Sequence, residues 1–301
     1  MEPDVGTALP PAPHAALDEP TASARDGFDD VPLLSSRFAR SPVEGGTGLS
    51  AVEIDRGRVL LRVPLGPGTL DSTGRVSALV TSVAVDTALG IAVHTFTSTR
   101  SGGPTVELRV DHHAPPAAGA SCLLVEGVGV HEDRTCGVGH VSVRDDLGTL
   151  IAHAAGTMVV DPLSIGQHRG FWKDFTGVPK LDLTALPPGL DGTTTSTDPA
   201  ELRLPLSPSI ANLRGDVHGG MVMAIAHAAQ ARLAAAHPAP SRPLTTTVDY
   251  LRPVPLSGEL TCRSTVVRDG RRFRTVRTEL VRDDGKIAAT ATGTVVVLPN
   301  D

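Results

Sequence analysis

The chain of 301 residues is 40% hydrophobic, 20% charged and 3% aromatic, and its formal net charge is -6. This length suits two domains of ordinary size, and the apolar fraction is sufficient for a packed core. The scarcity of aromatic side chains and the mildly acidic balance disfavour a nucleic acid as a partner. We therefore expect a globular protein that does not bind nucleic acid.

Residues 1–35 are rich in Pro, Ala, Asp and Glu and lack the apolar region of a signal peptide, so we predict a flexible tail. No apolar run approaches the ~18 residues that a membrane span needs, which predicts no membrane partner. Cys122, Cys136 and Cys262 show no metal-ligand spacing and are typical of a reduced, cytoplasmic protein. We predict no metal site.

An internal repeat organises the rest of the chain. The succession Val-Arg-Asp-Asp, Ile-Ala and Gly-Thr in 143–160 returns in 281–297, and the two Gly-Thr pairs are 137 positions apart. Upstream, Asp71-Ser-Thr-Gly74 pairs with Asn212-Leu-Arg-Gly215 at an offset of 141. A repeat of this size, present twice, predicts a domain duplication. We expect one domain at 36–160 and another at 201–301.

The first copy is expected to begin with a strand at 59–63, after which 78–93 forms one long apolar stretch. This stretch exceeds strand length and is rich in Ala and Val, which predicts a buried helix. Four further strands are predicted at 105–112, 121–130, 136–144 and 150–160. The crossing segment 161–200 contains Pro, Gly and a Thr/Ser run, with one short helix expected near 163–172.

The second copy repeats this order, with a strand at 202–204 and a buried helix at 219–236. Four strands are again predicted, at 244–250, 259–267, 272–281 and 287–298, with Asp-Gly turns between them. One long helix followed by an antiparallel meander predicts an α+β fold in which the helix lies on the sheet.

The entry to the second helix reads Asn212-Leu-Arg-Gly-Asp-Val-His218-Gly219-Gly220-Met221. Glycines at a helix start let a ligand approach the backbone closely. Free N–H groups and the helix dipole there can hold the carbonyl oxygen of a thioester as it gains negative charge. The same glycines are equally compatible with close helix–sheet contact alone.

This helix entry, the later Tyr250-Leu-Arg-Pro253 and the terminal Gly-Thr strand together resemble the PaaI-like branch of the hotdog-fold acyl-CoA thioesterases. The resemblance covers nearly all of the second copy and is weaker in the first. It implies a double hotdog with active sites between two hotdog units. One unit supplies the His-Gly-Gly backbone, and the other supplies an acidic residue nine positions after its own counterpart of the His. Coenzyme A enters only as part of the substrate, and no cofactor is implied.

The sequence departs from the family pattern in a complementary way. Nine residues after His218 stands His227, whereas nine residues after Ser77, the counterpart of His218, stands Asp86. The first copy has the acid without the glycines, and the second has the glycines without the acid. We therefore predict one composite site between the copies and a degenerate mirror site at His227 and Ser77.

The resemblance implies a role for each residue of the composite site. Asp86 would act as general base or as nucleophile, and the Gly219 amide would hold the carbonyl oxygen. Asn212 and His218 would hold the loop, and Thr105 would help to position water. The alternative for Asp86 is a structural carboxylate, although an acid in an apolar helix is costly unless it is paired or used. His227 is interpreted as a buried neutral histidine, a vestige or a replacement base.

Further residues are predicted to contact the substrate. Gly220 and Met221 are assigned to an apolar acyl pocket, and Arg252, Arg271 and Arg272 to the phosphates of coenzyme A, unless these arginines are simply solvated. Three other functions remain open: a non-catalytic acyl-CoA or lipid-binding module, a hotdog hydratase or dehydratase, and a structural subunit of a larger assembly. A homodimer of double hotdogs is the expected assembly.

Overall fold

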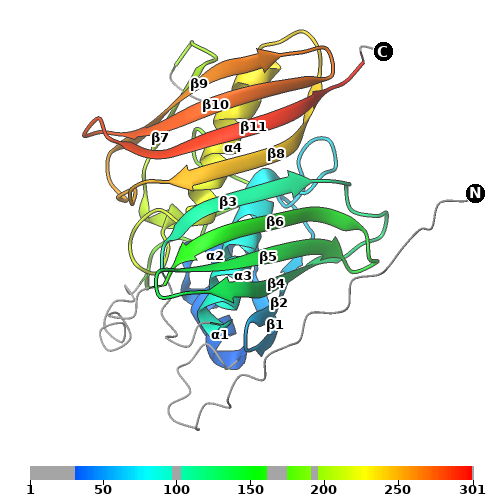
Figure 1. The fold of residues 1–301 in the computed structure, drawn as a ribbon, viewed down its shortest axis with the longest axis vertical. Coiled ribbons are helices and arrows are strands. Elements are labelled where there is room, and N and C mark those ends of the chain that lie inside the picture. The colour runs from blue at the N-terminus through cyan, green and yellow to red at the C-terminus, as the bar shows by residue number, and fades with distance from the viewer. Residues whose placement is uncertain (1–30, 97–102, 161–174, 191–195, 300–301) are drawn as a thin grey trace, which may run out of the picture.

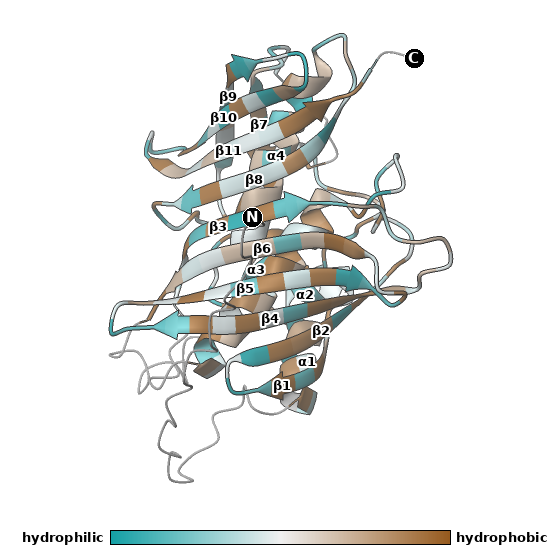
Figure 2. Cartoon of the chain, turned by 45° about the vertical axis from the view of Figure 1, so that its right-hand side comes forward, coloured by the Kyte–Doolittle hydropathy of each residue, from teal (hydrophilic) through white to brown (hydrophobic). Residues whose placement is uncertain are grey.

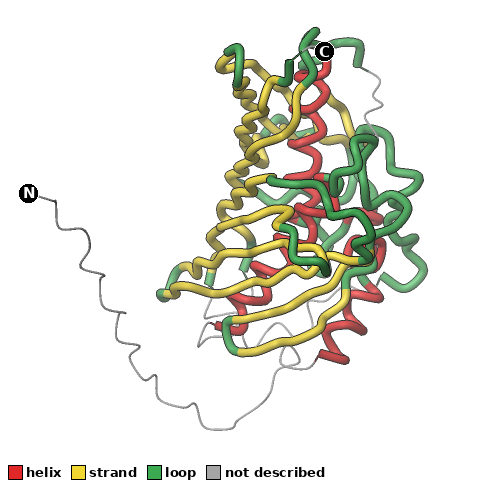
Figure 3. The backbone as a smooth tube through the Cα atoms, turned by 90° about the vertical axis from the view of Figure 1, so that its right-hand side faces the viewer, coloured by secondary structure: helices red, strands yellow, loops and turns green. Residues whose placement is uncertain are grey.

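The computed structural model describes residues 31–96, 103–160, 175–190 and 196–299. The short helix predicted near 163–172 and residues 1–30 of the predicted tail lie outside these ranges. Within them the strands form one eleven-stranded sheet with every neighbouring pair antiparallel, and the long helices cover one face of it (Figures 1 and 3). The predicted α+β class is confirmed.

The first half of the chain contains three helices and six strands among the described residues. In chain order these are α1 (Val31–Arg40), α2 (Pro42–Thr47), β1 (Ser50–Asp55), β2 (Arg58–Pro64), α3 (Ala78–Phe96), β3 (Thr105–His112), β4 (Cys122–Glu132), β5 (Cys136–Asp145) and β6 (Leu150–Val159). The second half contains β7 (Glu201–Pro205), the 3-10 helix η3 (Pro208–Ile210), α4 (Gly219–Ala235), β8 (Ser241–Tyr250), β9 (Glu259–Asp269), β10 (Phe273–Arg282) and β11 (Ile287–Val297).

The strand order shows the repeat directly. The sheet runs β1-β2-β4-β5-β6-β3-β8-β11-β10-β9-β7. Apart from the additional edge strand β1, each half has the same order when it is read from its outer edge to the centre. The halves join where β3 pairs with β8, with Leu108 opposite Val248. Because the two central strands are antiparallel, each helix lies beside the other across this join (Figure 1).

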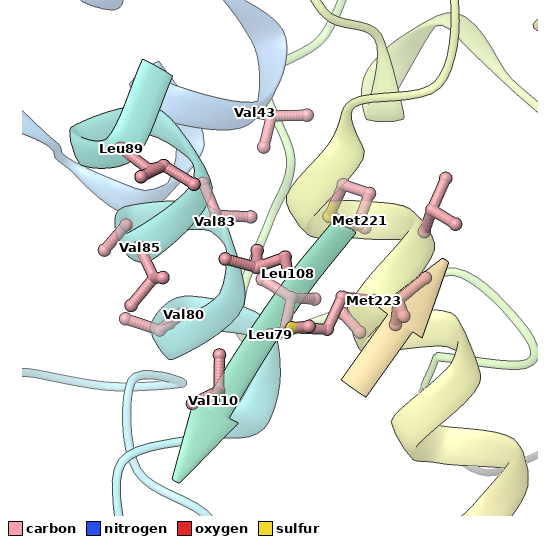
Figure 4. Close-up of a cluster of buried hydrophobic side chains, with 14 of the residues drawn as sticks. Val43, Leu79, Val80, Val83, Val85, Leu89, Leu108, Val110, Met221 and Met223 are labelled. Carbon is pink, nitrogen blue, oxygen red and sulfur yellow. The ribbon is translucent and has the colours of Figure 1, made fainter. Parts of the chain in front are cut away.

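The helices α3 and α4 pack so closely that Gly220 is required at their crossing. A Cβ atom at Gly220 would lie 2.6 Å from both the carbonyl oxygen of Ser82 and the Cα atom of Val83. Figure 4 shows Val83 of α3 turned toward the side of α4 that carries Met221. The core is therefore continuous between the two halves.

The helix α3 is long and apolar enough, by length and composition, to cross a membrane. The expectation that no apolar run approaches this length is therefore wrong. In the protein 78% of its most apolar window is buried, because β2, β4, β5 and α4 surround it. A helix that is covered on most sides is apolar all round and lacks a polar stripe. The burial of α3 is therefore that of a helix in the core of a protein.

The strands show the opposite pattern. Figure 2 shows hydrophobic and hydrophilic residues alternating along β5, where buried Val141 and Val143 are separated by the less buried Ser142. One face of the strand therefore lies against the helices and the other faces outward.

Three elements of the first half were not predicted, namely α1, α2 and β1. The helix α1 begins at Val31, so residues 31–35, expected to be part of the tail, are helical. Its Leu34 and Phe38 are 2% and 3% exposed, as buried as core residues. Together α1 and α2 form an addition that has no counterpart among the described elements of the second half.

Candidate active site

A pocket of about 620 Å³ lies where the two halves meet. The first half contributes Asp86 and Thr105 to its lining, and the second half contributes Asn212, Gly219 and Tyr250. The added helices α1 and α2 line it as well. Its size is within the usual range for small-molecule sites.

Asp86 lies at the centre of this junction, on α3, and is 8% exposed. Its Oδ1 atom accepts a hydrogen bond of 2.8 Å from the Thr105 hydroxyl at the start of β3. Its Oδ2 atom accepts a hydrogen bond of 2.9 Å from the backbone N–H of Gly220, in the first turn of α4. The start of this helix favours a negative charge, so the carboxylate is held by donors from both halves.

The same carboxylate leaves no room for a side chain at Gly219. A Cβ atom at this position would lie 2.7 Å from Asp86 Oδ2, so the carboxylate lies directly against the glycine backbone. The Tyr250 hydroxyl donates a 3.0 Å hydrogen bond to the carbonyl oxygen of Gly219 and fixes the helix start to β8. Burial raises the pKa of Tyr250 well above its ordinary value and Asp86 adds to the shift, so this hydroxyl remains a donor.

His218 precedes the helix and is paired with acids on both sides. Its Nδ1 atom is 3.4 Å from Asp86 Oδ2, and its Nε2 atom is 3.3 Å from Oε1 of Glu44 on α2. The Gly220 N–H also lies 3.0 Å from Nδ1, and the Thr87 hydroxyl lies 3.4 Å from Nε2. The ring is thus fixed between the carboxylate of α3 and that of the added helix α2.

The two buried partners tune one another. Burial alone would lower the pKa of His218, but the charge and hydrogen bond of Glu44, and then the charge of Asp86, raise it above its ordinary value. Burial alone would raise the pKa of Glu44, but His218 and the Ser41 hydroxyl lower it. Glu44 and His218 therefore each favour the charged form of the other.

The side chain of Asn212 makes hydrogen bonds within the loop before α4. The Oδ1 atom of Asn212 accepts hydrogen bonds from the backbone N–H groups of Arg214 at 2.8 Å and of Gly215 at 3.0 Å. Gly215 has φ +90°, a backbone conformation that favours glycine, so the turn depends on this residue as well. The structure therefore brings Asp86, Thr105, Asn212, His218 and Gly219 to one pocket.

Several residues assigned to substrate contact lie elsewhere. Met221 is fully buried between the helices and does not line the pocket, and Gly220 serves the helix crossing and the bond to Asp86. Arg271 and Arg272 are exposed in the turn between β9 and β10, away from the pocket lining. These assignments are corrected. Arg252 does line the pocket, and its guanidinium donates to the carbonyl oxygen of Ile287 at 2.7 Å.

Sequence reasoning missed Glu44 and Tyr250. Ser41-Pro-Val-Glu44 has the Ser-x-x-Glu spacing of a helix start, a signal that could have located α2. No local signal indicates that Glu44 reaches His218, which is 174 positions away.

The mirror position is built differently. His227 stands where the repeat places Asp86, and its Nδ1 atom is 3.4 Å from the hydroxyl of Thr246, the counterpart of Thr105. The rings of His227 and His112 are 5.6 Å apart between centroids. Burial lowers the pKa of His227 to about 4. Burial, and to a smaller extent the charge of His227, lowers the pKa of His112 to about 3. Both rings are therefore neutral near pH 7.

Ser77, predicted for the mirror site with His227, precedes the helix α3. Its hydroxyl accepts a 3.2 Å hydrogen bond from the N–H of Val80 and so caps the start of α3. The cavity that Ala78 and His227 line here has a volume of only about 30 Å³. This cavity is too small for a thioester.

Residues 208–296 match the family model described as the acyl-CoA thioesterase N-terminal domain. No curated protein matches the sequence. Among solved structures, the tesB protein of Mycobacterium avium subsp. paratuberculosis is 14% identical, with a TM-score of 0.56 over 83% of this chain and 96% of that protein.

Two further structures have similar TM-scores. A hotdog-fold protein of Alicyclobacillus acidocaldarius is 15% identical, with a TM-score of 0.54 over 88% of this chain and 99% of that one. An acyl-ACP thioesterase of Bacteroides thetaiotaomicron is 12% identical, with a TM-score of 0.51 over 79% and 98%. At these identities the likeness shows the fold.

The fold is that of the hotdog proteins, and residues 208–296 are assigned to the acyl-CoA thioesterase domains by their match to the family model. The match that carries this assignment lies in the second half, the half that supplies the His218-Gly219-Gly220 backbone.

Proposed function

We propose that this protein hydrolyses an acyl-CoA thioester to the free acid and coenzyme A at one composite site between its halves. One observation carries the proposal: the carboxylate of Asp86, from the first half, accepts a hydrogen bond from Gly220 at the helix start of the second half. An acid and a helix N-terminus at one apolar junction are the groups that thioester hydrolysis requires.

In the proposed reaction the thioester carbonyl oxygen lies at the backbone N–H of Gly219. Asp86 takes a proton from water, and the resulting hydroxide attacks the carbonyl carbon. The negative oxygen of the tetrahedral intermediate is stabilised by the Gly219 N–H and the dipole of α4. The carbon–sulfur bond then breaks, and the thiolate leaves and takes up the proton held by Asp86.

A nucleophilic route uses the same atoms. An oxygen of Asp86 attacks the carbonyl carbon and displaces the thiolate, and water then hydrolyses the mixed anhydride. The two routes differ in the source of the oxygen in the product. A single turnover in H₂¹⁸O places ¹⁸O in the free acid by the first route, and in Asp86 by the second when water attacks the side-chain carbonyl carbon of the anhydride.

The neighbouring side chains prepare the carboxylate. Thr105 orients Oδ1 through its 2.8 Å hydrogen bond, and the His218 ring lies beside Oδ2. Glu44 holds the His218 ring from the opposite side. Asn212 is assigned to the loop that carries His218. Arg252 at the pocket is assigned to the phosphates of the coenzyme A portion.

The proposal includes several finer expectations. The motif supports an assignment to the PaaI-like branch, and the proposed reaction includes no cofactor or metal. The three cysteines are free thiols, which suits the reducing cytoplasm. A homodimer of double hotdogs is the proposed assembly.

The test is free-thiol release from short, medium, long and aromatic acyl-CoAs with the wild-type protein and the Asp86→Asn variant. We expect hydrolysis of at least one thioester by the wild type and its loss in the variant. Wild-type turnover that Asp86→Asn leaves unchanged would contradict the assigned site. Binding of the thioesters without any turnover would support the non-catalytic module instead.

A further inference from the structure

A second pocket, of about 440 Å³, lies in the second half and follows the same repeat as the first. His227 and Ala231 line it 141 positions after Asp86 and Gly90, which line the first pocket. The two pockets therefore occupy equivalent places beside α4 and α3. Toward the first half, the His227 ring lies against His112, and the cavity that these two residues line is only about 30 Å³, too small for a thioester.

Gln230 is the feature of this pocket that core formation does not explain. Its counterpart in the first half is Leu89, which is fully buried. Both side chains lie against a glycine of the sheet: a Cβ atom at Gly293 would be 2.1 Å from Gln230 Oε1, and one at Gly156 would be 2.6 Å from Leu89 Cδ2. The fold thus accepts a leucine at this position, yet the second half carries an amide.

The side-chain amide of Gln230 has an N–H donor without an acceptor among the described residues. The residue is 4% exposed, it lines the pocket, and its Nε2 atom is buried without a hydrogen-bond partner among the described residues. A buried N–H donor without an acceptor is unfavourable, and such groups in native proteins normally have a partner. An oxygen atom of a ligand in this pocket would supply it.

The remaining lining indicates the charge of that ligand. Thr246 adds a hydroxyl, and Arg242 adds a positive charge, while no Asp or Glu is among the described residues that line the pocket. Alanine and proline side chains, including Ala231 and Pro243, form half of the rest, and the other half includes histidine, serine and threonine side chains. The pocket therefore combines donors and one cation with a small, aliphatic wall.

We infer that this pocket is a second, non-hydrolytic site that binds the carboxylate of a short or medium aliphatic acid, with Gln230 as its hydrogen-bond donor. Acids of this class are the products of the reaction proposed for the first pocket, and only that link to the product rests on the proposed function. The site retains the position of an ancestral second active site and has exchanged its acid for neutral and positive groups.

The test is isothermal titration calorimetry with sodium octanoate on the full chain. Gln230→Leu introduces the residue that the first half uses at this position, and Ala231→Leu fills the pocket. We expect the affinity of one octanoate site to fall by about tenfold or more in each variant, because the amide donor or the space is lost. Thioester hydrolysis, measured in parallel, should be unchanged.

The matched control is Gly90→Leu, which fills the first pocket at the position equivalent to Ala231. We expect it to abolish hydrolysis and to leave the Gln230-dependent octanoate site intact. Octanol, which lacks a carboxylate, should bind at least tenfold more weakly to this site. If the wild type hydrolyses no thioester, the calorimetry still decides the binding question.

Three results would overturn the inference. One is no octanoate binding by the wild type at millimolar concentration. Another is binding that Gln230→Leu and Ala231→Leu leave unchanged while Gly90→Leu removes it, which would place octanoate in the first pocket alone. The third is equal affinity for octanol and octanoate, which would exclude recognition of a carboxylate.

Discussion

The Asp86 carboxylate and the backbone nitrogen of Gly220 are 2.9 Å apart, although 134 positions separate the two residues in the sequence. The contact joins the helix of one half to the helix start of the other. The first half lacks the glycine turn and the second half lacks the acid. The arrangement therefore exists only when the two halves pair through β3 and β8.

Replacing Gly219 by alanine tests how closely the carboxylate and the backbone must meet. The added Cβ atom would lie 2.7 Å from Asp86 Oδ2, so the carboxylate must move. We expect kcat to fall by about tenfold or more, since displacement of a catalytic group by even 1 Å is costly. The matched change is Ala78→Gly at the equivalent position of the first half, which should leave kcat unchanged. Equal activity of wild type and Gly219→Ala would contradict the assigned role.

Removing the Thr105 hydroxyl tests the orientation of Asp86. In Thr105→Val the Oδ1 atom loses its 2.8 Å hydrogen bond. A hydrogen bond to a charged group contributes about 1.5–3 kcal/mol, so we expect kcat to fall about tenfold to a hundredfold. Thr246→Val alters the equivalent hydroxyl beside His227 and should leave thioester hydrolysis intact. Equal losses in the two variants would assign the hydroxyls to the fold rather than to the reaction.

The Glu44–His218 pair predicts a defined dependence of stability on pH. The pKa of Glu44 is lowered, so its contribution is present above its ordinary value of about 4.5 and is lost as pH falls through the folded pKa. The pKa of His218 is raised, so its contribution is present below about 6.5 and is lost as pH rises through the folded pKa. The pair is therefore most stabilising between these two ordinary values.

The variant Glu44→Gln should lower the free energy of unfolding most within that window. It leaves the charge of His218 without this partner, and breaking one side of a buried ion pair costs about 3–5 kcal/mol. Denaturant unfolding of wild type and variant between pH 4 and pH 9 measures the difference. A difference that stays constant across this range would show that the pair does not titrate as assigned.

The helix crossing predicts an unusual response to alanine at Gly220. Alanine is the better helix former by about 1 kcal/mol, so helix propensity alone predicts a more stable protein. The Cβ atom would instead lie 2.6 Å from the backbone of Ser82 and of Val83, and backbone cannot move away cheaply. We expect a lower melting temperature for Gly220→Ala in calorimetry. An unchanged or higher melting temperature would contradict the required close approach.

Much of this organisation follows from the sequence because the repeat is strong. The helices predicted at 78–93 and 219–236 are found at Ala78–Phe96 and Gly219–Ala235. The first and last residues of the predicted strands differ from the observed ones by only a few positions. The offset of 141 aligned Asp86 with His227, and the resemblance to the hotdog thioesterases implied that Asp86 faces the glycine turn. Local patterns alone do not encode this contact.

Other features could not be predicted, for physical reasons. A helix covered on most sides has apolar residues all round, so no polar stripe indicates that Met221 faces the other helix instead of the pocket. Arg271 and Arg272 carry a suitable charge, but charge alone does not place a turn near a site. Glu44 belongs to a six-residue helix without a repeat counterpart, and its contact with His218 depends wholly on the tertiary fold.

The most direct test of the composite site compares two equivalent positions in one assay. Free-thiol release from the best acyl-CoA would be measured for wild type, Asp86→Asn and His227→Asn. The account predicts a loss of about 10²-fold or more in kcat for Asp86→Asn, the usual contribution of a general base, and wild-type turnover for His227→Asn. Equal losses in the two variants, or full activity of Asp86→Asn, would contradict a single site that pairs the acid of one half with the glycine turn of the other.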